Sequence, residues 1–422
     1  MNLLLVILFT ASYLLIVLEH PLQVNKAASA LLGGALLWVV YALFNHSAVA
    51  QLDRSLTAIA EIVFFLMGAM AVVEVVDAHD GFSVVTEKIK AENKTALLWI
   101  VSFITFFLSA VLDNLTTTIV MVSVIRKLIK GKEDKILFSS MTVIAANAGG
   151  VWSPIGDVTT TMLWIGGQIE AMPTIKALAI PSLVNLMVPL LMISYGFKGQ
   201  KVVLNSAQSL AADSTVTNFE RKLIFFVGIG LLCFVPAFKE LTHLPPFMGI
   251  LFALGILWFC GDLLHQNKAE SHKQHLSLTA ALHRIDLSSI LFFTGILLAV
   301  SVLEHAELLN ALADFLAHKI GNQTLIIGLL GMLSAVIDNV PLVAAAMGMY
   351  PLNEFPANSF TWQFLAYAAG TGGSIFIIGS AAGIAAMGLE KIDFFWYFRK
   401  ISGLALIGYI AGALTYCLLA SV

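Results

Sequence analysis

A succession of long apolar segments separated by short charged ones most constrains what this chain can fold into. A helix needs about 17–25 predominantly apolar residues to cross a bilayer. Charged residues make up 12% of the chain, about half of the share that is usual in a soluble domain. The sequence therefore predicts an all-α polytopic membrane protein. It excludes a disordered chain, a nucleic-acid binder and an ordinary cytosolic enzyme.

The apolar runs predict about ten transmembrane helices. The predicted crossings are 3–19, 27–44, 58–76, 136–165, 177–197, 222–238, 247–264, 287–304, 362–389 and 401–420. The first segment has neither a basic head nor a cleavage site of small residues, so we expect a retained helix rather than a signal peptide.

Two further apolar stretches do not fit simple crossings, because an acid–amide pair interrupts each near its middle. Asp113-Asn114 interrupts the stretch 95–128, and Asp338-Asn339 interrupts the stretch 324–350. The halves of each stretch are too short to span a bilayer. We therefore expect two re-entrant helical hairpins, each with its acid–amide pair at the tip.

The charges that flank the two stretches predict the side from which each hairpin enters. Lys94 precedes the first stretch and Lys130 follows it. Because basic loops stay in the cytoplasm, both ends of this stretch lie on the cytoplasmic side. Between Lys319 and Lys391 the sequence has no Lys or Arg, so the second hairpin is expected to enter from the opposite side.

Three motifs of the first half return in the same order in the second half. With Gly68 aligned on Gly295, the paired segments lie 227, 225 and 223 residues apart. They are Phe64–Gly68 with Phe292–Gly295, Leu108–Asn114 with Leu333–Asn339, and Ala148–Gly150 with Thr371–Gly373. Each half then holds five crossings and one hairpin. Because five is odd, the second copy is inverted in the membrane. We expect a first repeat over 1–197, a cytoplasmic linker over 198–221 and a second repeat over 222–422.

Two of the predicted crossings contain residues that break helices. The segment Asn147–Asp157 has three glycines and Pro154, and the segment Gly370–Ser374 has three glycines. Glycine and proline disfavour a helix interior, and unwound backbone at membrane depth survives only inside protein or beside a cavity. Inverted repeats with broken helices are typical of secondary transporters, which bind their substrate near the middle of the membrane.

Ionisable side chains inside a crossing indicate a functional site. The deep acids are Glu61, Glu74, Asp113, Asp157 and Asp338, and we expect them to lack basic partners at depth. Carboxylate, amide and hydroxyl oxygens are what a hard cation prefers. The predicted cation- and proton-binding residues are Asp113, Asn114, Thr116, Asn147, Asp157, Thr159, Thr160, Ser334, Asp338, Asn339, Thr371 and Glu61. Asp113 and Asp157 are the expected ligands of Na⁺.

A simpler structural role competes with each of these assignments. Asp113, Asp157 and Asp338 could each do no more than cap the helix that follows, because Asp is favoured at that position. Glu61 could lie at the outer edge of its crossing rather than in the core.

The segments Ser109–Thr118, Ser153–Thr161 and Ser334–Pro341 resemble the NhaD-type sodium/proton antiporters of the ion transporter superfamily. The resemblance implies export of Na⁺, and often Li⁺, in exchange for protons across a bacterial inner membrane. It also implies a homodimer with a scaffold region and a mobile transport region, and no cofactor. The transport residues would then lie mainly in the first half, because Ser380 stands where a second copy of Asp157 would be.

Two other functions compete with cation–proton exchange. A Na⁺-coupled carboxylate or anion symporter of the same superfamily would use similar hairpins. An intramembrane aspartyl protease would need two aspartates within hydrogen-bonding reach, and it explains neither the hairpins nor the hydroxyl cluster. We therefore expect a transporter and not an enzyme.

Overall fold

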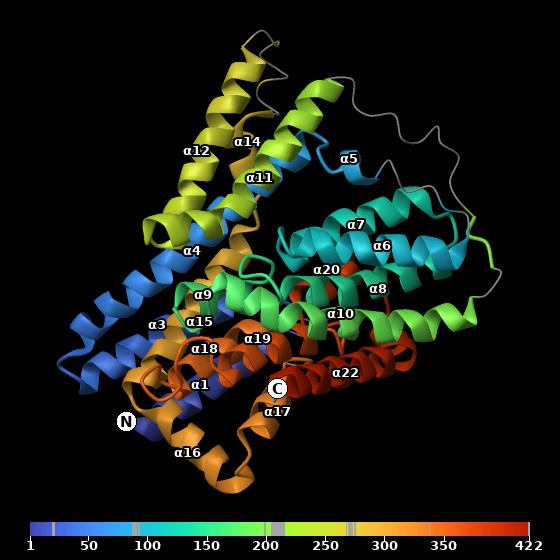
Figure 1. Cartoon of the computed structure of the whole chain (residues 1–422). Helices are drawn as coiled ribbons and strands as arrows, with labels where there is room; N and C mark the ends of the chain where they lie inside the picture. The colour runs from blue at the N-terminus through green and yellow to red at the C-terminus, as the bar shows by residue number, and fades with distance from the viewer. Residues whose placement is uncertain are drawn as a thin grey trace.

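The computed structural model of the chain describes residues 1–18, 22–86, 91, 93–197, 200–203, 216–266, 268, 273, 276–336 and 338–420. Every regular element within these residues is a helix (Figure 1). The prediction of an all-α protein is therefore confirmed. Most of the predicted linker 198–221 lies outside the described residues.

The helices of the first half follow the predicted order. They are α1 (Asn2–Val17), α3 (Lys26–Phe44), α4 (Ala48–Ala78), α5 (Ser83–Thr86), α6 (Lys94–Ser109), α7 (Asn114–Leu128), α8 (Lys132–Gly150), α9 (Val158–Ile165) and α10 (Ala171–Gly196). Both predicted interruptions are present, because α6 and α7 are separated at Asp113 and α8 and α9 are separated around Pro154.

The second half runs in a similar order. Its helices are α11 (Asn218–Thr242), α12 (Pro246–His265), α14 (Leu278–Leu282), α15 (Leu287–His305), α16 (Leu308–Ile320), α17 (Gln323–Leu333), α18 (Asn339–Met349), α19 (Phe360–Gly372), α20 (Ala381–Glu390), α21 (Phe394–Tyr397), the π-helical turn η2 (Phe398–Ser402) and α22 (Gly403–Ala420). Seven helices of the described chain are long and apolar enough to cross a membrane, which makes this a multi-pass membrane protein.

One set of helices, the outer group, consists of α1, α3, α4, α11, α12 and α15. Within it α3 packs against α1 and α15, and α12 packs against α4 and α11. Gly34 allows α3 to approach α15 closely, because an added Cβ would lie 2.5 Å from the carbonyl oxygen of Gly295. Small residues let helix backbones approach in this way inside a membrane.

A second set of helices, the hairpin group, consists of α6 to α10, α17 to α20 and α22. It contains the helices on either side of each predicted acid–amide pair. Here α8 packs against α6 and α7, α17 packs against α19, and α10 packs against α22. In Figure 1, α4, α11 and α12 lie apart from α6, α7, α8 and α10. The helix breaks lie inside the hairpin group, where protein buries the unwound backbone as membrane depth requires.

Two elements differ from the sequence-based expectation. The helix α4 extends well beyond the predicted crossing 58–76, because the polar segment Gln51–Arg54 continues the helix outside the apolar run. The helix α16 was not predicted, since its polar residues Asp314, His318 and Lys319 interrupt every apolar run. Helix formation outside the bilayer does not need a continuous apolar sequence.

Candidate functional site

The first acid–amide pair lies at the start of α7. The Asp113 carboxylate caps this helix: one oxygen accepts from the backbone N–H of Thr116 at 2.8 Å. The other oxygen accepts from the Thr116 hydroxyl at 2.6 Å. The positive end of the α7 dipole also favours the negative charge of Asp113. Asp113 therefore does cap the helix, and it also presents a carboxylate at the helix break.

A second carboxylate lies at the break between α8 and α9. Asp157 caps α9 by accepting from the backbone N–H of Thr159 at 2.7 Å and from the Thr159 hydroxyl at 2.5 Å. Asp157 is only 1% exposed. Thr160 is also buried, and its hydroxyl donates to the Asp157 carbonyl oxygen at 3.1 Å. Unlike a surface cap, this carboxylate is enclosed by protein.

Asn114 brings the two helix breaks together. Its side-chain nitrogen donates to an Asp157 carboxylate oxygen at 2.6 Å and to the Asn147 carbonyl oxygen at 2.9 Å. Asp157 also interacts electrostatically with Asp113 and Asp338. Hydrogen bonds join the predicted residues Asn114, Asn147, Asp157 and Thr159, and Asp113 with its partner Thr116 adjoins them as the chain neighbour of Asn114. These six residues are here called the aspartate cluster.

Asn147 joins the aspartate cluster to the second half of the chain. Its side-chain nitrogen donates to the hydroxyls of Ser374 and Ser380, each at 2.9 Å. The predicted binding residues include neither serine, although Ser374 ends the predicted helix break Gly370–Ser374. The internal repeat contained the signal for Ser380, because this serine stands where a copy of Asp157 would be.

The predicted second-half residues Ser334, Asn339 and Thr371 are buried, but the two hydroxyls among them bond to backbone carbonyl oxygens. The Ser334 hydroxyl bonds to the carbonyl oxygens of Gly331 at 2.7 Å and Ala369 at 2.9 Å, and so joins α17 to α19. The Thr371 hydroxyl donates to the Tyr367 carbonyl oxygen one turn earlier in α19. Asn339 is 5% exposed at the start of α18.

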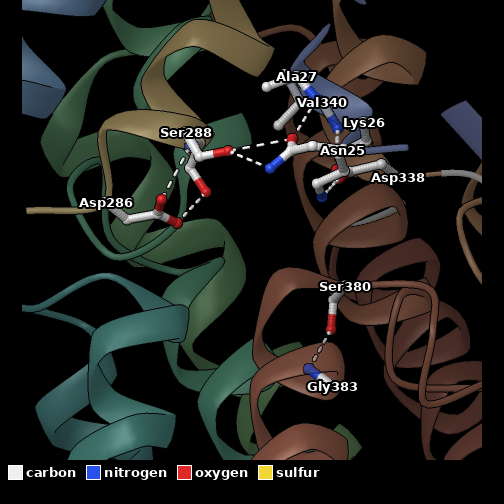
Figure 2. A network of polar contacts seen from close by, with 10 residues as sticks. Asn25, Lys26, Ala27, Asp286, Ser288, Asp338, Val340, Ser380 and Gly383 are labelled. Carbon is white, nitrogen blue, oxygen red and sulfur yellow. Dashed lines mark hydrogen bonds and ion pairs between the residues drawn. The ribbon is translucent and has the colours of Figure 1, made fainter. Parts of the chain in front are cut away.

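The expectation that the deep acids lack basic partners is wrong for Asp338. The Lys26 ammonium lies 3.3 Å from an Asp338 carboxylate oxygen. Figure 2 shows the two side chains facing each other. This partner could not be foreseen, because the two residues are 312 positions apart and Lys26 lies just before a predicted crossing. Glu61 lies on α4, half-buried, and interacts electrostatically with Lys239.

A cavity reaches the aspartate cluster from the outer group. Asp113 and Asn114 line it on one side, and Phe65 and Met70 of α4 and Ile250 of α12 line it on another. The lining is mainly apolar. The cavity therefore reaches the break between α6 and α7 at the junction of the two helix groups.

The aspartate cluster has the composition of a site for a hard cation. It combines two carboxylates with amide and hydroxyl oxygens, which are the ligands that such ions prefer. Its carboxylates can also take up protons, so a cation and a proton can occupy the same oxygens in turn.

Comparison with known proteins agrees with this chemistry. A family model described as "Citrate transporter" matches residues 13–372. Sodium/proton antiporter 1 of Arabidopsis thaliana is 52% identical over 97% of this chain and 71% of its own length. Sodium/proton antiporter 2 of the same plant is 49% identical over 97% of this chain and 98% of its own. The Na⁺/H⁺ antiporter NhaD of Vibrio cholerae is 30% identical over 98% of this chain and 91% of its own. The chain therefore belongs to the citrate transporter family and is an NhaD-type antiporter homologue.

Proposed function

We propose that this protein exchanges Na⁺ for protons across a membrane. The observation that carries the proposal is the buried Asp157 carboxylate, which Asn114 connects to the tip of the first hairpin. The names of the NhaD-type relatives support the same exchange. Li⁺ is expected as a second substrate, because it prefers the same oxygen ligands.

In the proposed mechanism, Asp113 and Asp157 supply the charge that binds the cation. Asn114 donates to Asp157 and is itself held by Asn147, and the backbone N–H groups of Thr116 and Thr159 hold the two carboxylates at their helix breaks. When Na⁺ leaves, the carboxylates take up protons. If only a site loaded with Na⁺ or protons can reorient between the two sides, the competition enforces exchange, and the protein works by alternating access.

We further propose that the chain consists of two inverted repeats with ten crossings and two re-entrant hairpins. Equivalent contacts in the two halves support this. Ser109 bonds to the Ala146 carbonyl oxygen as Ser334 bonds to that of Ala369. The half-helix α9 packs against α18 and α19, and α20 packs in the same way against α7 and α8.

The helix breaks also pack alike in the two halves. A Cβ added to Gly156 would lie 2.5 Å from the Ser109 carbonyl oxygen, and one added to Gly379 would lie 2.7 Å from that of Ser334. Each hairpin thus packs against the break of its own half at a glycine. This equivalence supports a duplication.

The topology predicts the side from which each hairpin can be labelled. Single cysteines would replace Lys94, Lys130, Gly321 or Asn353 in a chain whose Cys233, Cys260 and Cys417 are changed to serine. A membrane-impermeant thiol reagent should reach the first two positions from the cytoplasmic side only and the last two from the opposite side only. Labels at Lys94 and Lys130 on opposite sides would exclude both the first hairpin and the inverted repeat.

The alternative is a symporter of Na⁺ with an organic anion, which the description of the family model favours. The aspartate cluster argues against it, because an organic anion beside Asp113 and Asp157 would be repelled. Purified protein in vesicles separates the two functions. With an acidic lumen, external Na⁺ should make the lumen more alkaline, whereas N-methylglucamine should not. Na⁺ uptake that leaves lumenal pH unchanged and requires citrate would establish symport instead.

We also propose a homodimer in a bacterial inner membrane. The bacterial NhaD relatives support this location, whereas the two relatives of higher identity are plant proteins. The mass of the detergent-solubilised protein tests the dimer, and membrane fractionation of the source cells tests the location.

A further inference from the structure

The two hairpins begin their second helices with the same type of cap but with different partners. At the second tip, one Asp338 oxygen accepts from the backbone N–H of Val340 at 3.3 Å. The other oxygen accepts from the Lys26 ammonium, also at 3.3 Å. Figure 2 shows this contact between Lys26 and Asp338. The two side chains are 21% and 15% exposed, so the ion pair is largely buried.

Lys26 is held by the outer group and not by the hairpin that it contacts. It is the first residue of α3, which Asn25 caps by accepting from the backbone N–H of Ala27 at 2.8 Å. Asn25 in turn bonds to Ser288 beside the start of α15 at 3.1 Å. The ammonium lies 4.4 Å from the centre of the Phe292 ring, a distance at which the ring attracts a cation. The outer group therefore presents a fixed positive charge to the second tip.

The first tip has a different charge arrangement. At the second tip, one Asp338 oxygen accepts from the Lys26 ammonium. The corresponding oxygen of Asp113 accepts instead from the uncharged Thr116 hydroxyl. The counterpart of Asp157 is Ser380, whose hydroxyl accepts from the backbone N–H of Gly383 at 3.2 Å. The first half thus places two carboxylates at its helix breaks. The second half places one carboxylate there and balances it with an ammonium.

We propose that Lys26 is a built-in counter-ion for Asp338, and that it takes the place at the second hairpin that transported Na⁺ takes at the first. The inference rests on the proposed exchange of Na⁺ for protons. A second cation beside Asp338 would be repelled by the ammonium, so Asp338 is not a ligand of the transported ion. Lys26 acts as a positioning residue, because it neutralises the second tip and confines the transported charge to the aspartate cluster.

A double-mutant cycle tests the counter-ion. Lys26→Gln and Asp338→Asn each leave a buried charge without its partner. This destabilises the folded protein more than removing both charges does. We expect each single variant to lower the maximal exchange rate by about tenfold or more, and the double variant to recover to within about threefold of the unaltered protein. Lys26→Arg, which keeps the charge, should lose less than Lys26→Gln.

The Na⁺ concentration for half-maximal exchange separates this role from ion binding. It should return to within about threefold of the unaltered protein in the double variant, because removing both charges leaves the net charge near Asp157 unchanged and removes no ligand of Na⁺. If Asp338→Asn raised it by an order of magnitude or more and Lys26→Gln did not rescue the loss, Asp338 would be an ion ligand and the proposal would be wrong. Losses that add in the double variant would mean that Lys26 and Asp338 act independently of each other, which also overturns the proposal.

Thermal unfolding of the four purified proteins without Na⁺ provides a readout independent of transport. Both single variants should unfold at a lower temperature, and the double variant should regain most of the difference. If the unaltered protein exchanges no Na⁺, the proposed function fails while this cycle still reports the buried ion pair. If exchange is normal but neither cycle shows recovery, the counter-ion alone fails.

Discussion

Asp157→Asn should abolish Na⁺ transport while the protein still folds and inserts. The asparagine amide keeps a carbonyl oxygen that can accept the Thr159 N–H, and Asn caps helices as well as Asp does. The substitution therefore removes the charge of the site and leaves the start of α9 in place. The amide NH2 group then faces the Asn114 nitrogen, so the hydrogen bond from Asn114 is lost together with the charge.

The expected effect is large because the lost charge would lie next to the ion. A unit charge about 4 Å from a cation contributes about 4 kcal/mol at an effective dielectric constant of about 20. This corresponds to a loss of about three orders of magnitude in Na⁺ affinity. The loss of Na⁺ affinity is measured by uptake of radioactive Na⁺ into vesicles. Asp113→Asn should lower the Na⁺ affinity in the same way.

The matched control is Asp53→Asn, which makes the same chemical change at an exposed position of α4. It should leave Na⁺ uptake within about twofold of the unaltered protein, because an exposed charge at a distance is screened by salt. Elution as a single peak and an unchanged melting temperature would show that the Asp157 variant is folded. Normal Na⁺ uptake by that variant would remove Asp157 from the binding site.

The sequence contained enough information to predict the breaks at which the site is built. The glycines and Pro154 between Asn147 and Asp157 disfavour a helix, and the structure ends α8 at Gly150 and begins α9 at Val158. Asp113 and Asp338 each precede a helix as its cap. These are local effects of residue type, so a reading of the sequence can find them.

Contacts between parts of the chain that are distant in the sequence were harder to predict. Apolar patterning distinguishes crossings from loops but does not say which crossings meet, so the pairing of Lys26 with Asp338 could not be derived from it. The repeat predicts that the two breaks lie close together, yet it does not predict which atoms bond. The contacts of Asn147 with Ser374 and Ser380 required the structure.

Lowering the pH should weaken the apparent affinity for Na⁺ without lowering the maximal transport rate. Na⁺ and protons use the same carboxylates of the aspartate cluster, so a bound proton must leave before Na⁺ can bind. At a pH where the empty site is mainly protonated, each further unit of acidity should raise the half-saturating Na⁺ concentration by up to about tenfold per exchanged proton. At a pH where the empty site is ionised, this concentration should not depend on pH.

Initial rates of Na⁺ uptake, measured over a series of Na⁺ concentrations at each pH, distinguish competition from inactivation. Competition requires that enough Na⁺ restores the full rate at low pH. Inactivation by acid would instead lower the maximal rate and leave the half-saturating concentration unchanged. The Asp53→Asn variant should reproduce the pH dependence of the unaltered protein, because its substitution lies outside the aspartate cluster. A half-saturating Na⁺ concentration that stayed constant across the whole pH range would mean that Na⁺ and protons bind at separate sites, and the competition mechanism would have to be abandoned.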